Sequence, residues 1–352
     1  MALDIAGRRI AEDEPPFVIA EGGVNHNGSV EVALHLVDAA AGAGADAVKF
    51  QTFSADAVVF EDAPQAAYQR ERAPAGSQLE MLRRLELPAD AWPALEARAT
   101  ARGIVFFSTP FDLASVQLLA TLGIPAFKIG SGDLTNLVLL RAVAALGRPV
   151  LLSTGMASWS EIDASVEDLR THGDPALVLL QCTSAYPAAP ADANLLAMEA
   201  MRARYGVPVG YSDHTLGIGV AVAAAALGAA VIEKHLTLDR ALPGPDHQAS
   251  LDPGEFGAMV VAVRQAADAR GGGDKAAAAA EAEARQLARR SLVVTRAVAA
   301  GAELIAADLD AMRPAGGISP QRLDDVIGRR AAHDLPQGSL LGPDDVVPSL
   351  RP

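Results

Sequence analysis

Several features that bear on function are scarce or absent in this sequence of 352 residues. It has one cysteine, Cys182, so no disulfide can form within the chain, which fits a reducing compartment. No apolar run reaches the roughly 20 residues that a membrane-spanning helix needs. The N-terminal stretch MALDIAGRRIAEDEPP lacks the apolar core of a signal peptide. A formal net charge of -14 argues against nucleic acid or an anionic membrane as a partner. We therefore expect a cytoplasmic protein.

Eight short apolar runs stand out in what is present, and each ends in or just after a polar residue. Strands buried in a parallel sheet are apolar throughout. Polar residues that gather only at the C-terminal ends of such strands indicate a functional site at that end. The runs are Phe17–Glu21, Ala47–Thr52, Ile104–Thr109, Ala126–Gly130, Pro149–Thr154, Leu177–Cys182, Val207–Ser212 and Ala230–His235.

Helical patterns separate these runs, the first of them over Ser29–Ala43. Eight repeats of strand and helix predict an α/β fold, a (β/α)8 TIM barrel, which takes about 250 residues. Thr52–Pro88 is longer than a usual strand–helix loop and predicts an insertion over the barrel mouth. Gly271–Arg285 breaks the pattern, and short β-type runs follow it. We predict a catalytic barrel in 1–270, a linker in 271–288 and a small β-rich domain in 289–352.

The alternation of side chains along a strand sorts the polar strand ends, because residues two apart share a face. Lys49 and Gln51 point the same way, as do Glu233 and His235, while Lys234 takes the opposite face. The polar strand ends therefore converge on one site. They are Glu21, Lys49, Gln51, Thr109, Lys128, Ser153, Gln181, Ser212, Glu233 and His235.

Lys49 and Lys128 are the candidates for binding an anion. Two lysines on the inner face of a barrel repel each other unless an anion lies between them or each is paired with Glu or Asp; we favour the anion. The glycine-rich sequences IGSGD and STG that follow two of the strands add hydroxyl and backbone N–H groups suited to a phosphate.

His214 and His235 follow neighbouring strands, where two imidazoles can bind a divalent cation and leave positions for water and substrate oxygens. The alternative for each is a hydrogen-bonded structural histidine. Glu21 is a candidate acid or base, or else the partner of a lysine. His247 is a weaker candidate, and Asn25–Gly28 is interpreted as a turn and helix cap at least as readily as a ligand contact.

Longer motifs in the chain resemble those of the sialic acid synthases. In order, they are EGGVNHNG, AGADAVKFQTF, FFSTPFD, FKIGSGDLTN, PVLLSTGM, GYSDHTLG and VIEKHLTLDRALPGPDHQASL. Near the C-terminus, MRPAGGISP and DDVIGRRAAHDLPQGSLL resemble the family's antifreeze-like (SAF) domain, a β-clip. The resemblance implies a TIM barrel followed by this domain, assembled as a domain-swapped homodimer. Members condense phosphoenolpyruvate with N-acetylmannosamine or a related 2-acetamido sugar.

The resemblance also implies a role for individual residues. Those that match the phosphoenolpyruvate-binding set are Lys49, Thr109, Lys128, Ser131, Ser153 and Ser212. Ser184, also assigned to substrate binding, falls where some members have asparagine. His214 and His235 match the ligands of a divalent metal, usually Mn²⁺, with Mg²⁺ or Co²⁺ as alternatives. Those that match residues near the sugar are Glu21, Gln51, Tyr186 and Asp246. Arg313 matches an arginine that reaches the N-acetyl group from the partner chain.

On this basis we expect a carbon–carbon bond-forming transferase that makes N-acetylneuraminate or a legionaminate-type acid, with Glu21, His214 and His235 as catalytic residues. The alternatives are a Schiff-base aldolase on the same fold and a non-catalytic sugar-binding protein. The family often has EAG where this chain has EGG, and SEYPAP where it has SAYPAA, which bears on sugar specificity. Ser77–Leu87 looks closer to neuraminate and legionaminate synthases than to pseudaminate synthases.

Overall fold

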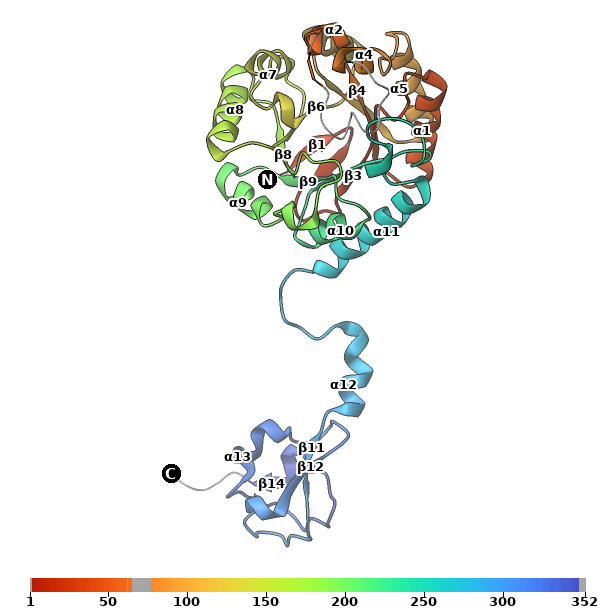
Figure 1. Ribbon diagram of the computed structural model, residues 1–352. Coiled ribbons are helices and arrows are strands. Elements are labelled where there is room, and N and C mark those ends of the chain that lie inside the picture. Colours follow the sequence, from red (N-terminus) through yellow and green to blue (C-terminus); the bar gives the residue numbers. More distant parts are fainter. Residues whose placement is uncertain (1, 62, 65–76, 348–352) are drawn as a thin grey trace. The chain divides into compact units, whose positions relative to one another are not determined.

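Eight parallel strands form the core of the first of two compact units, Met1–Gly272 and Gly273–Pro352. The computed structural model describes residues 2–61, 63, 64 and 77–347 (Figure 1). The strands close into a barrel in the order β10-β3-β4-β5-β6-β7-β8-β9, which confirms the predicted TIM barrel. They are β3 (Phe17–Gly23), β4 (Ala47–Thr52), β5 (Val105–Pro110), β6 (Phe127–Ile129), β7 (Val150–Ser153), β8 (Leu177–Cys182), β9 (Val209–Asp213) and β10 (Val231–His235).

Helices follow the strands and ring the barrel (Figure 1). Short polar residues begin several of them, because a side-chain oxygen can accept from an otherwise unpaired N–H of the first turn. Ser29 caps the first helix in this way, as the sequence predicts, and Asp252 and Glu255 form a capping box on the last. These helices are α1 (Val30–Gly42), α5 (Ala91–Arg102), α6 (Leu113–Leu122), α7 (Leu137–Ala144), α8 (Trp159–His172), α9 (Ala197–Tyr205), α10 (Gly219–Ala226) and α11 (Pro253–Arg270).

Two short helices, α2 (Ala55–Val58) and α4 (Gln78–Arg83), lie within the predicted insertion, part of which falls outside the described residues. Met81 and Leu85 bury their side chains against Val24 in the loop after β3. A side chain at Gly28 in the same loop would meet the backbone carbonyl of Arg84, so this close approach requires glycine. The insertion is therefore anchored to the barrel next to the end of β3.

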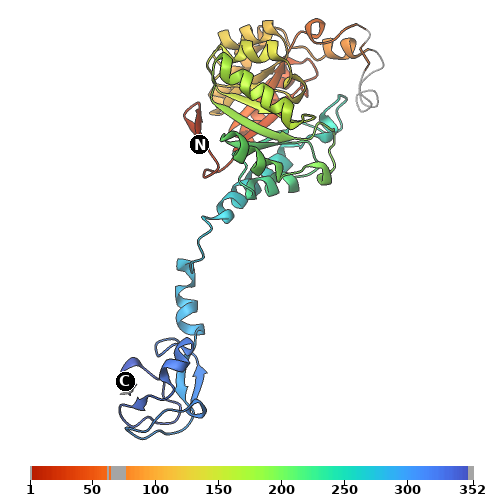
Figure 2. The same ribbon diagram turned by 90° about the vertical axis from the view of Figure 1, so that its left-hand side faces the viewer.

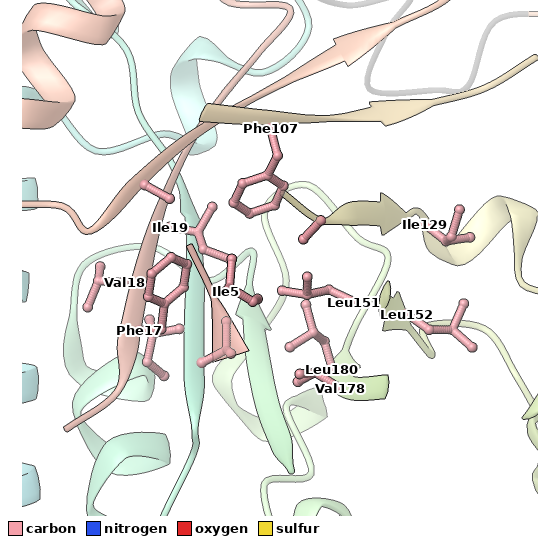
Figure 3. Packing of buried hydrophobic residues seen from close by; sticks show 14 of the residues in the cluster. Ile5, Phe17, Val18, Ile19, Phe107, Ile129, Leu151, Leu152, Val178 and Leu180 are labelled. Carbon is pink, nitrogen blue, oxygen red and sulfur yellow. The ribbon is translucent and has the colours of Figure 1, made fainter. Parts of the chain in front are cut away.

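A hairpin that the sequence analysis did not predict, β1 (Leu3–Ile5) with β2 (Arg8–Ile10), covers the opposite end of the barrel (Figure 2). Ile5 joins the apolar core that contains Phe17 and Ile19 (Figure 3). Asp46, just before β4, accepts from the backbone N–H of Val18 at 2.8 Å and pairs with Arg8 and Arg264. These contacts hold the hairpin, two strands and the last barrel helix together.

The second unit is small and rich in loops, as the sequence predicts. Strand β11 (Ser291–Val294) pairs antiparallel with β12 (Leu309–Met312), and β13 (Arg330–Ala331) pairs with β14 (Val346–Val347). The helices of this unit are α12 (Ala282–Ala288) and α13 (Leu323–Val326). A separate cluster of buried apolar side chains, among them Leu304, Leu335 and Leu341, gives this unit its own core.

We expect Gly210→Ala to destabilise the barrel by about 1–3 kcal/mol, because overpacking a well-filled core forces its neighbours apart. A Cβ at Gly210 in β9 would meet the carbonyl oxygen of Val231 and lie 2.8 Å from Leu180 Cδ2. Urea unfolding followed by tryptophan fluorescence measures this, since both tryptophans belong to the barrel. Gly219→Ala, which meets no atom within 4 Å, is the control. Equal midpoints for the two variants would contradict the expectation.

Candidate active site

The polar strand ends surround a cavity of about 470 Å³ at the C-terminal end of the barrel. The residues predicted from the sequence to form the site line this cavity, except Gln181, Asp246 and Arg313. The lining residues among them are Glu21, Lys49, Gln51, Thr109, Lys128, Ser131, Ser153, Ser184, Tyr186, Ser212, His214 and His235. A neighbouring cavity of about 480 Å³ shares Met156, Cys182 and Ser184 with it but is lined by no lysine or histidine; Gln181 faces that cavity instead.

Two buried lysines and two buried glutamates form the charged centre of the cavity. The ammonium group of Lys49 contacts the carboxylate of Glu21 and lies 3.9 Å from Glu233. The ammonium group of Lys128 lies 3.6 Å from Glu233, which also accepts a hydrogen bond of 3.0 Å from Ser212. The lysines therefore have carboxylate partners, which is the alternative that the sequence analysis ranked second. Charge balance alone does not require an anion here.

Burial and pairing act against each other on the pKa values of these four groups. Burial lowers the pKa of Lys49, but the charges of Glu21 and Glu233 outweigh it and the pKa is raised. Burial dominates at Lys128 and lowers its pKa, and it raises the pKa of Glu21. Burial would also raise the pKa of Glu233, but the two lysines outweigh it and the pKa is lowered. Glu233 is thus the carboxylate that both ammonium groups keep ionised.

Small residues and hydroxyl groups form one wall of the cavity, beside the lysines. The hydroxyl of Thr109 accepts from the Lys49 ammonium at 3.0 Å, and that of Ser131 accepts from the backbone N–H of Gly155 at 3.0 Å. A Cβ on Gly155 would lie 2.5 Å from Ser184 Oγ and 2.8 Å from Ser131 Oγ, so a larger residue here would displace these hydroxyls. Within the part of the chain that the structure describes, Ser153 Oγ is buried without a hydrogen-bond partner. This wall can offer hydroxyl and N–H groups to an anion.

The two predicted metal ligands lie side by side, with ring centroids 5.5 Å apart. His214 Nδ1 is 2.8 Å from the carbonyl oxygen of Thr183. Because a carbonyl only accepts, Nδ1 carries the proton and Nε2 keeps a lone pair. Burial lowers the pKa of His214, but its contacts with Cys182 and the Thr183 carbonyl outweigh this effect and the pKa is raised. Burial strongly lowers the pKa of His235 and favours its neutral ring, and its Nδ1 is buried with no hydrogen-bond partner among the described residues.

These histidines fit a divalent cation that is completed by other ligands. The unpaired Nδ1 of His235 and the free lone pair of His214 are donors of the right kind. In residues 2–61, 63, 64 and 77–347, no group of three or more His, Cys, Asp or Glu side chains is arranged to hold a metal ion. A cation at this pair would therefore take its remaining ligands from water and substrate oxygens.

The other wall carries the residues assigned to the sugar. Tyr186 packs on His214 with ring centroids 4.2 Å apart. Gln51 donates to Glu21 at 3.3 Å, and the β3–β4 register shifts between Glu21 and Gly23. Such a bulge changes the direction in which a side chain points. Asp246 lies outside the cavity lining, with its carboxylate 3.8 Å from His235 Nδ1.

Two of the weaker candidates have structural roles. In the loop after β3, the Asn25 amide donates to the carbonyl of Leu236 and to the hydroxyl of Ser250, both at 2.9 Å. His247 Nδ1 lies 2.7 Å from Thr237 Oγ1. Neither Asn25 nor His247 lines the cavity, so the turn-and-cap interpretation of the first loop describes it better than ligand contact.

Several residues that line the cavity had no role assigned from the sequence, among them Glu233, Gln78 and Cys182. Glu233 was recognised as a polar strand end, but its place between two lysines depends on neighbouring strands. Gln78, at the start of α4, reaches the cavity from the insertion and carried no sequence signal. Cys182 is buried and lines the cavity with its sulfur 3.7 Å from His214 Nδ1.

Arg313 belongs to the second unit, where it follows β12, and its side chain is exposed. The structure describes that unit by itself, so the predicted reach of Arg313 to a substrate stays a prediction. No helix among the described residues is long and apolar enough to cross a membrane.

Comparison with known proteins identifies relatives over most of the chain. The NeuB family matches residues 36–275, and the SAF domain matches residues 289–347. An N,N'-diacetyllegionaminic acid synthase of Legionella pneumophila is 43% identical over 92% of this chain and 93% of its own. One of the same name from Campylobacter jejuni is 42% identical over 92% of this chain and 98% of its own.

Solved structures agree with this assignment. The N-acetylneuraminic acid (sialic acid) synthetase of Leptospira borgpetersenii superimposes with a TM-score of 0.73 at 35% identity, over 81% of this chain and 95% of its own. A spore coat polysaccharide biosynthesis protein of Bacillus subtilis gives 0.67 at 32% identity, over 99% and 100%. The family matches, the relatives and the closed barrel with its converging polar strand ends lead to one assignment: this chain belongs to the NeuB family and carries a C-terminal SAF domain.

Proposed function

We propose that this protein is a nonulosonate synthase, which condenses phosphoenolpyruvate with the open-chain form of a 2-acetamido hexose and water and releases phosphate. The observation that carries the proposal is the cavity itself. A lysine pair with a wall of hydroxyl and N–H groups stands beside two neighbouring imidazoles, in a chain that is 43% identical to a legionaminic acid synthase. The first set suits an anionic enol phosphate, and the second suits a carbonyl substrate.

In the proposed reaction, C3 of phosphoenolpyruvate attacks the aldehyde carbon of the sugar and forms the new carbon–carbon bond. Positive charge develops at C2, and the former aldehyde oxygen becomes a hydroxyl after taking a proton. Water adds at C2 and loses a proton to give a C2 hydroxyl. The bond between C2 and the phosphate oxygen then breaks as that hydroxyl gives its proton to the departing phosphate and becomes the keto group. The products are the 2-keto acid and inorganic phosphate.

The lysines and hydroxyls orient phosphoenolpyruvate for this attack, which is chiefly an effect of position. Lys49 and Lys128 supply positive charge to the phosphate and carboxylate, and Ser153 has a free hydroxyl to donate. Residues assigned to the same task are Thr109, Ser131, Ser184 and Ser212. Both lysines already pair with glutamates, so the substrate must replace a glutamate as the partner of a lysine when it binds. Glu21, released from Lys49 by this exchange, is our candidate for moving a proton.

His214 and His235 would hold a divalent cation, which we take to be Mn²⁺, with Mg²⁺ or Co²⁺ as alternatives. When bound, such a cation acts as a Lewis acid on the sugar carbonyl. The Thr183 carbonyl keeps the His214 lone pair on Nε2, and Tyr186 packs against that ring. Tyr186, Gln51 and Asp246 are assigned to the sugar.

The sugar is proposed to be the 2,4-diacetamido precursor of a legionaminate-type acid, with N-acetylmannosamine as the second choice. The relatives named N,N'-diacetyllegionaminic acid synthase are 43% and 42% identical to this chain. A pseudaminic acid synthase of Campylobacter jejuni is 34% identical, and the human N-acetylneuraminate-9-phosphate synthase is 38% identical over a shorter region.

The direct test is a phosphate-release assay with phosphoenolpyruvate and each of a panel of 2-acetamido and 2,4-diacetamido sugars. We expect release that depends on the sugar, with the bridging oxygen of phosphoenolpyruvate retained in the phosphate. Sugar-independent release, or none with any sugar, would refute the proposal. Borohydride with pyruvate and sugar tests the aldolase alternative, because only an imine at a lysine is trapped as a stable adduct.

We expect Ser153→Ala to raise the KM for phosphoenolpyruvate about 10- to 100-fold, since a hydrogen bond to a charged group contributes about 1.5–3 kcal/mol. The variant should keep its thermal stability, because Ser153 Oγ has no protein partner among the described residues. Ser165→Ala is the matched control. Ser165 is also buried, and its hydroxyl lies 2.6 Å from the carbonyl of Leu134, so its loss should lower stability and leave the KM unchanged. An unchanged KM with lowered thermal stability for Ser153→Ala would show that Ser153 does not bind phosphoenolpyruvate.

We expect chelation to abolish turnover and a divalent metal to restore it, with Mn²⁺ tested first and Mg²⁺ and Co²⁺ beside it. The physical reason is that two histidines without a third protein ligand bind a cation weakly enough for a chelator to remove it. Metal-dependent phosphate release is the measurement. Full activity after rigorous chelation would show that the histidine pair does not need a metal.

We expect Arg313→Ala to raise the KM for the sugar while the KM for phosphoenolpyruvate changes little, because a guanidinium can donate to an N-acetyl carbonyl. Arg322→Ala, another exposed arginine of the same unit, is the control. In a swapped homodimer, mixing Arg313→Ala subunits with His214→Ala subunits creates one complete site in each mixed dimer. Activity at low sugar concentration should therefore reappear after subunit exchange. An unchanged sugar KM for Arg313→Ala would exclude the role.

A further inference from the structure

A fully buried ion pair lies on the outer face of the barrel, directly behind the two histidines. Lys234 Nζ is 2.7 Å from Asp213 Oδ2, and neither side chain is exposed to solvent. The two residues are register partners in the parallel pair of β9 and β10. One position earlier on the same strands, Ser212 donates to Glu233 inside the cavity. The pairing register of β9 and β10 therefore brings together the ion pair on the outer face of the barrel and the hydrogen bond on its inner face.

The ion pair is hydrogen-bonded to Thr215, so its contacts involve the residues before and after His214 in the sequence. The Lys234 ammonium also donates to the carbonyl oxygen of Thr215 at 2.6 Å. The second carboxylate oxygen of Asp213 accepts from the backbone N–H and the hydroxyl of Thr215, at 2.9 and 2.8 Å. The residues on both sides of His214 are thus held by one network, and the lysine in that network immediately precedes His235. Asp213 and Lys234 each adjoin one histidine of the candidate metal site.

Stability alone does not account for a buried ion pair at this place. Removing two charges from water costs more than their attraction commonly returns, and an apolar pair of similar volume stabilises a fold at least as well. Two positions earlier on the same strands, Tyr211 and Ile232 are buried in the apolar core. The Lys234–Asp213 ion pair, by contrast, lies where the ends of β9 and β10 must keep a defined spacing.

We propose that the Lys234–Asp213 pair is a positioning device, which fixes the backbone at His214 and its distance from His235 so that both rings can bind one divalent cation. Neither residue touches the cavity, and both act through the histidines that follow them in sequence. Residues that orient metal ligands from behind commonly change metal affinity about 10- to 100-fold when they are removed. The inference rests on the proposed metal site of His214 and His235.

The test uses the double variant Asp213→Asn/Lys234→Met in the full chain. The amide oxygen of asparagine can still accept from Thr215, and no unpaired charge remains, so the variant should fold with a melting temperature close to that of the unaltered protein. Binding of Mn²⁺ alone, measured by electron paramagnetic resonance, should weaken about 10- to 100-fold. Wild-type affinity in the double variant would overturn the proposal.

Asp46→Asn is the matched control, because Asp46 also pairs with basic partners but lies at the opposite end of the barrel. We expect it to lower the melting temperature and leave Mn²⁺ affinity unchanged. Mn²⁺ binding that weakens equally in both variants would show that the pair supports only the fold and would overturn the positioning role.

A second readout separates this inference from the metal proposal. His214→Gln should abolish Mn²⁺ binding; if neither this variant nor the wild type binds Mn²⁺, the metal site fails as part of the proposed function. The side-chain ¹⁵N resonances of selectively labelled histidines in metal-free protein then decide the positioning role. We expect His214 to hold one tautomer in the wild type and to average between two in the double variant. An unchanged His214 resonance would overturn the inference by itself.

Discussion

Buried charges must be paired, and this constraint governs how the barrel places its polar residues. Inside the cavity, Glu21 and Glu233 accompany Lys49 and Lys128. Outside the barrel, Asp213 accompanies Lys234. In every case the partners come from different strands, so each charge is tolerated only when the barrel is closed in its native register. Burying these charged strand ends without partners would cost free energy. Their pairing in the closed barrel allows them to form the cavity at its C-terminal end.

A balanced cavity also shapes what a substrate must do there. An anionic ligand does not meet unpaired lysines in this cavity, because the carboxylates of Glu21 and Glu233 already pair with the two ammonium groups. In the proposed reaction, the phosphate and carboxylate of phosphoenolpyruvate compete with the glutamates for the lysines. Binding is then coupled to a change in the surroundings of at least one glutamate. Among the described residues, the Ser153 hydroxyl has no protein partner and can bond to a ligand without such an exchange.

The parts of this arrangement that depend on one strand at a time could be predicted from the sequence, and those that depend on register could not. Parallel strands read as apolar runs, so Ala47–Thr52 and Leu177–Cys182 were predicted with the bounds the structure has. Side-chain alternation correctly turned Lys49 inward and Lys234 outward. The pairing of each lysine with a glutamate depends on which strands are neighbours in the barrel, and the sequence does not show this. The sequence analysis therefore favoured a bound anion as the partner of the lysines, where the structure has Glu21 and Glu233. The strands β1 and β2, of three residues each, are too short to show a period.

The proposed role of Arg313 rests on the family resemblance, and it agrees with the same accounting of charge. Each cation described in the cavity is committed to a carboxylate, and the Gln51 amide also donates to Glu21. A sugar that carries amide groups needs a donor that is not already held by such a partner. Arg313 is exposed, and within the part of the chain that the structure describes its guanidinium makes no ion pair. In the proposed function, a donor from the SAF domain would bind the sugar without disturbing the buried pairs on which the barrel depends. This separates substrate recognition from the charge balance that holds the strand ends together.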